Sequence, residues 1–241
     1  MNMVRLDKYL SEMGIGTRSE VKEYIKKGRV IVDGKIVRQP DFKLDSFESK
    51  VYFDNREVEY EAFQYFMINK PAGVVSATTD NHCRTVIDLI NTKKKKNLFP
   101  VGRLDKDTEG LLLITDDGEL AHRLLSPRKH VPKTYYARIQ GKVTGEDIAA
   151  FKKGMKLEED FITLPAQLVI LQNGEESEVL VTIYEGKFHQ IKRMFKAVGK
   201  EVLYLKRLSM GNLKLDETLA TGEYRKLTQE ELNILKGIDE T

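Results

Sequence analysis

The strongest constraint on the fold is that apolar residues occur in short runs, each ended by turn or capping residues. Short runs rich in branched and aromatic side chains predict strands, and capped segments with helical periodicity predict helices. The predicted strands lie at residues 63–71, 110–115, 133–140, 178–184 and 202–208. The predicted helices begin near Asp117, Thr144, Phe188 and Thr228. Because these elements lack the regular spacing of βαβ units, the sequence predicts an α+β fold with a largely antiparallel mixed sheet and flanking helices.

Length and composition exclude several classes of protein. A chain of 241 residues forms one large domain or two ordinary ones. No apolar run approaches the ~20 residues of a membrane-spanning helix, and the first residues lack the apolar segment of a secretory signal. Cys83 is the only cysteine, which excludes an intrachain disulfide and a Cys-x-x-Cys metal site. We therefore expect a cytoplasmic protein without a membrane partner.

The distribution of charge is more informative than the net charge of +3. Residues 187–207 contain seven basic residues and one acidic residue, a local charge of +6, and residues 121–140 contain five basic residues and no acid. Either run alone could be solvated surface, but two in one chain favour a polyanionic partner. Residues 75–97, which end in four lysines, are predicted to form a basic loop.

The first 45 residues have the pattern of a small separate module. Apolar residues recur at helical spacing from Leu6, and Thr17 and Glu20 form a capping box that opens a second, basic helix. Asp33 and Gly34 then form the turn of a predicted hairpin. The polar side of this module is basic and contains Arg5, Lys8, Arg18, Lys22, Lys26, Lys27, Arg29, Lys35 and Arg38.

This order of helix, capped basic helix and hairpin resembles the S4 domain, an αL-type RNA-binding module. The resemblance implies that the module binds structured RNA, without implying any particular chemistry. We expect an S4 domain and an acidic connector at residues 1–60 and a catalytic domain at 61–241. The residues expected to face RNA are Arg5, Lys8, Arg18, Lys22, Lys26 and Arg29.

A polar loop bracketed by Gly102 and Gly110 leads directly into the predicted strand 110–115, so the loop is anchored at a strand edge. It contains three candidates for chemistry, Arg103, Asp105 and Asp107. Spacing alone does not select a nucleophile among them, and an isolated aspartate here could be an ordinary turn residue.

The same segment, GRLDKDTEGL at 102–111, resembles the signature of pseudouridine synthases, and with the S4 domain it points to the RsuA/RluB group. The resemblance implies that Asp105 is the catalytic carboxylate and that Arg103 helps to hold RNA around an extruded nucleotide. It implies no chemical role for Asp107. Tyr135, in the KTY segment, matches the tyrosine that stacks on the target base, although in isolation it could be a core residue.

A third matching segment, EGKFHQIKRMF at 185–195, is expected to form an amphipathic helix. Its predicted buried residues are Phe188, Ile191, Phe195 and Val198, and its predicted exposed residues are His189, Lys192, Arg193 and Lys196. Many relatives have arginine after HQI, where this chain has Lys192 followed by Arg193. Alignment favours an ion pair between Lys192 and Asp105, with Arg193 acting mainly on RNA affinity.

The resemblance implies a complete reaction. A uridine is flipped out of ribosomal RNA, Asp105 acts covalently or assists glycosidic cleavage, and the uracil rotates and reattaches through C5. No cofactor and no metal are expected, because the reaction needs neither redox nor phosphate energy. The segment at 126–135 favours 16S rRNA or a pre-ribosomal small-subunit particle as the partner, and we expect a monomer. The alternatives are the same reaction on 23S rRNA, a catalytically silent S4-type assembly factor, and a glycosidase, which would need a second partnered acid.

Overall fold

The structure, a computed structural model, describes residues 3–92, 97–158 and 161–237. The chain forms two compact units, which meet in the sequence between Phe63 and Gln64. The four lysines of the predicted basic loop, residues 93–96, lie outside the described residues. None of the described helices is long and apolar enough to cross a membrane.

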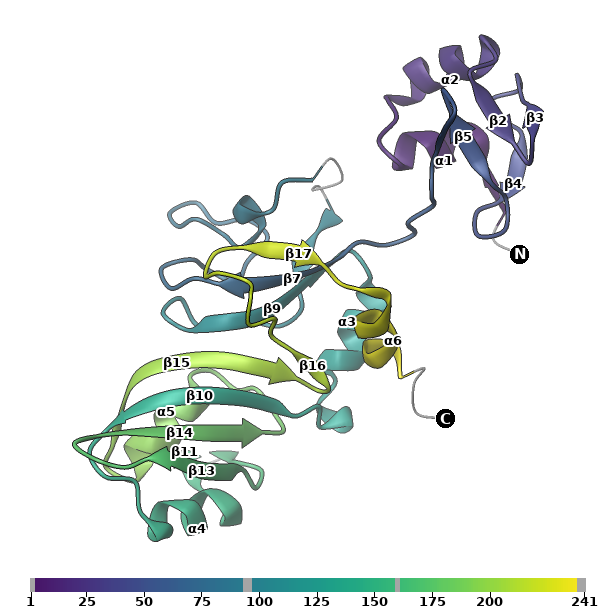
Figure 1. Cartoon of the computed structure of the whole chain (residues 1–241). Helices are drawn as coiled ribbons and strands as arrows, with labels where there is room; N and C mark the ends of the chain where they lie inside the picture. Colours follow the sequence, from purple (N-terminus) through teal and green to yellow (C-terminus); the bar gives the residue numbers. More distant parts are fainter. Residues whose placement is uncertain (1–2, 93–96, 159–160, 238–241) are drawn as a thin grey trace. The chain divides into compact units, whose positions relative to one another are not determined.

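The N-terminal unit contains two helices and two small sheets (Figure 1). The helices are α1 (Leu6–Glu12) and α2 (Arg18–Lys26). The strands are β1 (Met3–Arg5), which pairs with β4 (Lys43–Asp45), and β2 (Val30–Val32), β3 (Lys35–Ile36), β5 (Val51–Phe53) and β6 (Arg56–Glu57) in the order β3-β2-β5-β6. One apolar cluster that includes Leu6, Leu10 and Ile25 forms the core of this unit.

Local sequence signals account for this unit well. The predicted capping box is present, with the Thr17 side chain accepting from the Glu20 backbone and the Glu20 carboxylate accepting from the Thr17 backbone. The β2–β3 turn has left-handed backbone at both Asp33 (φ 50°) and Gly34 (φ 79°), as a two-residue hairpin turn requires. The predictions of the capped helix and of the hairpin are therefore confirmed.

The second unit is built on a nine-stranded sheet with the order β13-β14-β10-β15-β9-β7-β17, to which β8 and β16 add at β9 and β15. Its strands are β7 (Tyr65–Lys70), β8 (Phe99–Pro100), β9 (Glu109–Thr115), β10 (Lys133–Gln140), β13 (Gln167–Gln172), β14 (Glu176–Ile183), β15 (Glu201–Met210), β16 (Leu213–Lys214) and β17 (Tyr224–Lys226). Every pairing is antiparallel except that of β9 with β15. This confirms the prediction of an α+β fold with a largely antiparallel mixed sheet.

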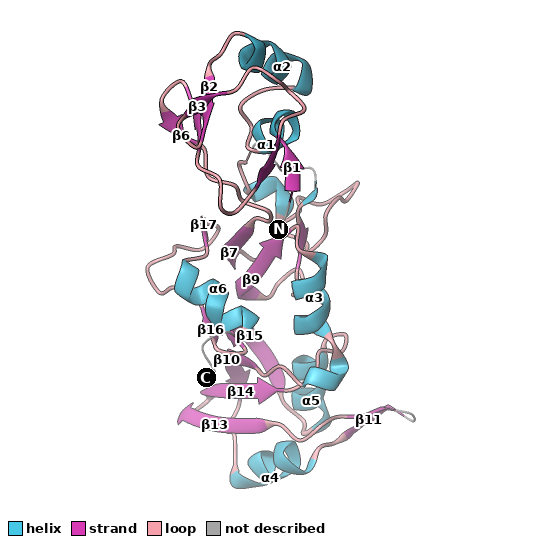
Figure 2. Ribbon diagram, turned by 90° about the vertical axis from the view of Figure 1, so that its right-hand side faces the viewer, coloured by secondary structure: helices cyan, strands magenta, loops and turns pink. Residues whose placement is uncertain are grey.

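Helices cover both faces of this sheet. They are α3 (Gly118–Leu125), α4 (Gly145–Lys153), α5 (Gln190–Ala197) and α6 (Gln229–Lys236), and a small hairpin is formed by β11 (Lys156–Glu158) and β12 (Phe161–Ile162). Side chains alternate between the faces along each strand, so Met67 packs with α3 and α6, whereas its neighbours Phe66 and Ile68 belong to the cluster that contains α4 and α5 residues. At the edge formed by β13, α4 lies alongside the sheet (Figure 2).

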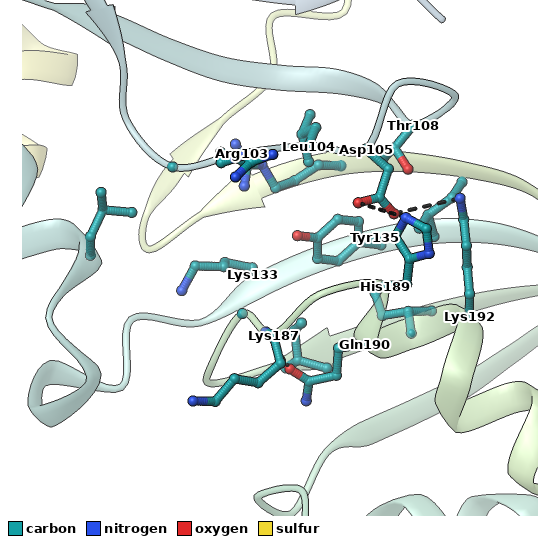
Figure 3. Close-up of a pocket in the computed structure, with 17 residues that line it drawn as sticks. Arg103, Leu104, Asp105, Thr108, Lys133, Tyr135, Lys187, His189, Gln190 and Lys192 are labelled. Atoms are coloured by element: carbon teal, nitrogen blue, oxygen red, sulfur yellow. Dashed lines mark hydrogen bonds and ion pairs between the residues drawn. The ribbon is translucent and has the colours of Figure 1, made fainter. Parts of the chain in front are cut away.

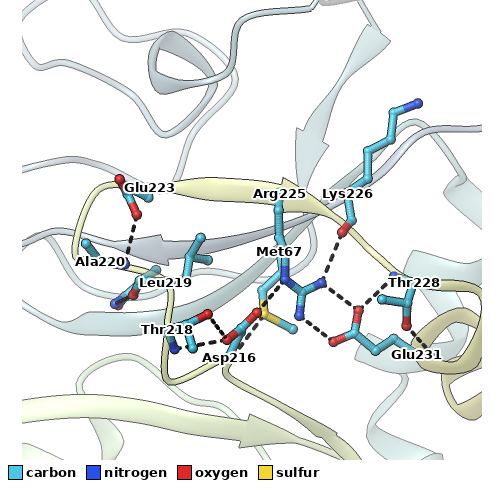
Figure 4. Close-up of polar contacts among 11 residues, drawn as sticks. Met67, Asp216, Thr218, Leu219, Ala220, Glu223, Arg225, Lys226, Thr228 and Glu231 are labelled. Carbon is cyan, nitrogen blue, oxygen red and sulfur yellow. Dashed lines mark hydrogen bonds and ion pairs between the residues drawn. The ribbon is translucent and has the colours of Figure 1, made fainter.

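The C-terminal segment is fixed by a polar network around Arg225 on β17 (Figure 4). The Arg225 guanidinium contacts Asp216 at 2.6 Å and both carboxylate oxygens of Glu231 at 2.7 Å. Glu231 also accepts from the backbone N–H of Thr228 in the capping box that opens α6. The network therefore joins the sheet edge, the loop after β16 and the last helix.

One prediction of burial is wrong. Helix α5 begins at Gln190, and Phe188, which we expected on its buried face, is 73% exposed. His189 has left-handed backbone (φ 48°), which turns the chain immediately before the helix and directs Phe188 outward. The two rings stack with their centroids 3.8 Å apart. Ile191 and Phe195 are buried as predicted, and Val198 is partly buried against the same core.

Candidate active site

The polar loop before β9 lies directly against β15. Gly102 and Gly110 both have left-handed backbone, with φ of 79° and 99°. A Cβ atom on Gly110 would collide with the backbone of Arg207 on β15, where the two strands run parallel. Glycine at position 110 therefore allows the close approach that places Asp105 over the sheet.

The buried Lys70 fixes the loop that contains Asp105 through hydrogen bonds to the backbone, and the sequence did not identify this residue. The Lys70 ammonium, at the end of β7, is completely buried and donates to the carbonyl oxygens of Pro71 (2.9 Å), Thr108 (2.8 Å) and Lys106 (3.3 Å). Burial lowers the pKa of Lys70 to about 8, although nearby carboxylates oppose this shift. The only sequence signal was a lysine at the end of a largely apolar predicted strand.

The Asp105 carboxylate lies beside two basic side chains, those of Lys192 and His189 (Figure 3). One oxygen is 3.5 Å from the Lys192 ammonium and the other is 3.7 Å from Nε2 of His189. The Asp105 and Lys192 side chains are each 25% exposed, so this contact is screened only in part by water. Helix α5 presents Lys192 to the loop, and the left-handed turn before that helix presents His189.

Lys192 is shared between two carboxylates, which the sequence did not predict. Its ammonium is closer to Asp107, at 2.6 and 2.8 Å, than to Asp105. Burial alone would raise the pKa of Asp107, but the hydrogen bond and charge of Lys192 lower it below its ordinary value. Arg193 points elsewhere, since its Nη1 donates to the Phe188 carbonyl at 3.3 Å and its guanidinium lies 5.7 Å from the Phe161 ring centroid.

Asp105 opens into a pocket of about 120 Å³. Tyr135 lies buried between Asp105 and Lys133 along its floor, and Ile183 and Leu205 contribute apolar surface (Figure 3). The acidic and basic residues that line it are Arg103, Asp105, Lys133, Lys187, His189, Lys192 and Arg207. An aromatic floor with one carboxylate and several cations suits a flat, polar ring attached to a polyanion. Nowhere in the described ranges do three His, Cys, Asp or Glu residues cluster as metal ligands would.

The six residues expected to face RNA in the N-terminal unit fall into two groups. Arg18 and Lys22 are exposed on α2. The other four contact acidic residues of the same unit: Arg5 with Asp7 (2.9 Å), Lys8 with Glu12 (3.6 Å), Lys26 with Glu23 (3.4 Å) and Arg29 with Asp54. Arg29 also lies over the rings of Tyr24 and Phe53.

Comparison with known proteins identifies the family. Residues 64–197 match the family described as RNA pseudouridylate synthase, and residues 4–49 match the S4 domain. A Bacillus subtilis (strain 168) protein described as an uncharacterized RNA pseudouridine synthase, YtzG, is 50% identical over 234 residues, which cover 96% of this chain and 98% of that protein. A crystal structure of a pseudouridylate synthase superimposes with a TM-score of 0.68 and 39% identity over 96% of this chain and 99% of the other.

Two relatives carry a more specific description. The ribosomal small subunit pseudouridine synthase A of Vibrio parahaemolyticus is 43% identical over 231 residues, and that of Escherichia coli (strain K12) is 41% identical over 230. Each alignment covers 95% of this chain and 98% of the relative. Fold and site together define an enzyme that rearranges a base in RNA. Within that class, the chain belongs to the pseudouridine synthase family with an N-terminal RNA-binding S4 domain, and it is an RNA pseudouridine synthase, an isomerase.

Proposed function

We propose that this enzyme converts one uridine of 16S ribosomal RNA to pseudouridine, with Asp105 as the catalytic carboxylate. The observation that carries the assignment of Asp105 is its position: it is the only carboxylate among the described residues that line the pocket, and it lies at one end of the Tyr135 floor. The choice of 16S rRNA is supported by the 41–43% identity to enzymes described as acting on the small ribosomal subunit.

The proposed reaction begins with extrusion of the uridine, at a cost of a few kcal/mol, because Asp105 cannot reach a base inside a helical stack. The uracil ring lies on Tyr135, and Arg103, exposed at the pocket, holds the surrounding RNA. The ionised Asp105 carboxylate acts as a nucleophile toward the nucleoside or assists cleavage of its C1′–N1 bond. The uracil then turns within the pocket and bonds to C1′ through C5.

Two basic side chains are proposed to orient the Asp105 carboxylate. Lys192 and His189 each lie against a different one of its oxygens. Asp107 competes for Lys192, so it limits how far the ammonium neutralises Asp105. Arg193 lies outside this contact and is proposed to act through RNA affinity.

We further propose that residues 1–60 form the docking domain and that residues 61–241 form the catalytic domain. Of the six residues expected to face RNA, Arg18 and Lys22 are exposed on α2 and form no ion pair with the described carboxylates of this unit, so they are the best placed of the six to contact phosphates. The other four expected residues form ion pairs with acidic side chains of the same unit. To contact RNA, each must exchange its carboxylate partner for a phosphate: Arg5, Lys8, Lys26 and Arg29. We also propose that the enzyme works in the cytoplasm on ribosomal RNA or on a pre-ribosomal small-subunit particle, and that it acts as a monomer.

Modification of purified RNA tests the choice of substrate. Unmodified 16S and 23S rRNA, free and within assembling subunits, are incubated with the enzyme and every pseudouridine is mapped. We expect one position in 16S rRNA to be modified by the wild-type protein and not by Asp105→Asn. Modification of 23S rRNA alone would refute the proposed substrate while leaving the reaction intact.

A further inference from the structure

Two cations, the buried Arg207 and the half-buried Lys133, line the part of the pocket that Asp105 does not contact. Arg207 on β15 is only 2% exposed, and the Lys133 side chain at the start of β10 lies across Tyr135 from Asp105 (Figure 3). Asp105, the only carboxylate among the described residues that line the pocket, contacts Lys192 and His189 instead. This end of the pocket therefore carries buried positive charge without a lining carboxylate of its own.

Both cations retain unused donors. Lys133 donates one hydrogen bond, to the Val131 carbonyl at 2.8 Å, and an ammonium has three N–H groups. Arg207 donates from Nε to the Leu111 carbonyl at 2.7 Å, but its buried Nη2 has no hydrogen-bond partner. Burial, and then the charge of Arg207, lower the pKa of Lys133 to about 8. An oxygen acceptor placed between the two cations would satisfy donors whose burial is otherwise unfavourable.

We propose that Lys133 and Arg207 bind the carbonyl oxygens of the extruded uracil and stabilise the uracil anion that forms when its glycosidic bond breaks. This inference rests on the proposed role of Asp105. It identifies a pair of electrostatic groups for the leaving base, at the opposite end of the pocket from the proposed nucleophile.

The strand register supports the base as the occupant. Tyr135 and Arg207 are direct partners across β10 and β15, so their side chains lie on the same face of the sheet. Lys133 lies two residues before Tyr135 on that face, a spacing of about 7 Å along a strand, which is close to the length of a uracil ring with its oxygens. A ring lying on Tyr135 with its sugar at Asp105 directs O4, which lies opposite N1, toward Lys133, and can present the side edge that carries O2 to Arg207 beside Tyr135.

The burial of Arg207 argues against a backbone phosphate as the group bound by Lys133 and Arg207. Arg207 is buried beneath the pocket, and phosphates adjacent to an extruded nucleotide remain with the strand at the pocket mouth. A flat base is the part of the nucleotide that enters the pocket. A phosphate and a uracil anion both present anionic oxygens, so the experiment below separates the two.

During the reaction, negative charge develops on the uracil, and cations beside its oxygens would stabilise that charge. When the C1′–N1 bond breaks, its electron pair leaves with the base, and the negative charge spreads from N1 over O2 and O4. The electron-poor sugar carbon is left beside the Asp105 carboxylate. When C5 forms the new bond to C1′, C5 loses its proton and N1 gains one, so the sum is an isomerisation without a co-reactant. Cations near O2 and O4 interact most strongly with the base between these two bond changes, when the charge on the oxygens is greatest, as differential stabilisation requires.

Substitution of Lys133 tests the proposal on the full-length protein. Single-turnover formation of pseudouridine is measured against pH for the wild type, Lys133→Met and Lys133→Arg, together with RNA affinity. Lys142→Met, an exposed lysine just beyond the other end of β10, is the matched control. We expect Lys133→Met to slow the chemical step by about 100-fold, the effect of removing one donor from developing negative charge, with RNA affinity changed less than threefold. Lys133→Arg should retain most of the rate.

The pH profile separates an electrostatic role from a merely structural one. The wild-type rate should fall above pH 8 as Lys133 loses its proton. In Lys133→Met and in Lys133→Arg the fall should be smaller, limited to the contribution of Lys70, whose pKa is also about 8. The other titratable or charged groups that line the pocket are Arg103, Asp105, Lys187, His189, Lys192 and Arg207, and all remain in these variants. An unchanged rate in Lys133→Met, or a slower rate that keeps the same fall above pH 8, would overturn the proposal.

A binding measurement makes the outcome independent of turnover. Equilibrium dialysis with free uracil should show weaker binding to Lys133→Met and to Arg207→Gln than to the wild type or to Lys142→Met. Circular dichroism establishes whether each variant is folded. If Arg207→Gln is unfolded, the comparison of Lys133→Met with the wild type decides the test. Inorganic phosphate is then added as a competitor. If it displaces uracil from the wild type but binds more weakly to Lys133→Met, the site belongs to the RNA backbone and the proposal is overturned. Turnover that persists in Asp105→Asn while uracil binding depends on Lys133 would refute the role of Asp105 and leave the base-binding site intact.

Discussion

Lys192 shows how one side chain can serve two partners in a catalytic loop. Its ammonium lies 3.5 Å from Asp105 and 2.6 Å from Asp107, although alignment predicted Asp105 alone. Alignment and helical geometry could select Lys192 over Arg193, because adjacent helical residues point about 100° apart. They could not place Asp107, because the path of the irregular loop depends on the buried Lys70, which lies outside the motif, and on the close approach of Gly110 to β15.

The contact of Lys192 with Asp105 predicts different losses of activity for three substitutions. Lys192→Met should reduce turnover by roughly 5- to 30-fold, since a pair that is one-quarter exposed contributes about 1–2 kcal/mol rather than the larger value of a fully buried pair. Lys192→Arg should retain much of the activity, and Arg193→Met should weaken RNA binding while leaving single-turnover rates nearly unchanged. Turnover lost in Arg193→Met with intact binding, and retained in Lys192→Met, would reverse this assignment.

Phe188 leads to a second prediction at the residue scale. Its neighbours in the sequence, Lys187 and His189, both line the pocket, and its ring is largely exposed. We predict that it stacks on a base beside the extruded uridine, so Phe188→Ala should weaken binding of the target RNA by roughly 5- to 150-fold, as loss of one aromatic–base stack does. Phe188→Trp should bind normally, and Leu171→Ala, at an exposed apolar position on β13, is the control. Equal affinities of Phe188→Ala and the control would exclude stacking.

At the scale of elements, local signals in the sequence predicted most of the strands. The runs at 110–115, 133–140, 178–184 and 202–208 coincide closely with β9, β10, β14 and β15. Their order in the sheet could not be predicted, because the parallel pairing of β9 with β15 depends on tertiary contacts between distant segments. The start of α5 was also wrong, because periodicity does not reveal the left-handed turn at His189.

The network that anchors α6 predicts a specific loss of stability in acid. Hydrogen bonds from Thr218 and Arg225 lower the pKa of Asp216 to about 2, from 3.8. A lowered pKa in the folded state stabilises the protein above the unfolded value, and this contribution disappears as the pH falls from about 4 to 2. The melting temperature of Asp216→Asn should therefore lie below that of the wild type at neutral pH and converge with it at pH 2. Glu217→Gln, at the exposed neighbouring position, should follow the wild type, and parallel curves for Asp216→Asn would contradict this assignment.

At the scale of the whole molecule, the sequence predicted two functional parts, and the structure has two compact units that meet after Phe63. Deletion of residues 1–63 should leave a folded catalytic unit with weaker RNA binding. Each lost phosphate contact removes about 0.9 for duplex RNA, or about 0.7 for a single strand, from the slope of log affinity against log salt. Affinity that is unchanged at every salt concentration would show that the S4 domain does not dock the substrate.

The role of Asp105 is tested most directly by one substitution in the full-length enzyme. Asp105→Asn keeps the size of the side chain and removes its charge, while affinity should depend mainly on phosphate contacts elsewhere. Release of tritium from C5-labelled uridine RNA is measured beside RNA affinity, with Asp107→Asn as the matched carboxylate control. The predicted result is no detectable release by Asp105→Asn, affinity within a few-fold of wild type, and continued release by Asp107→Asn. Release by Asp105→Asn at a rate near that of the wild type would contradict the proposed catalytic role of Asp105.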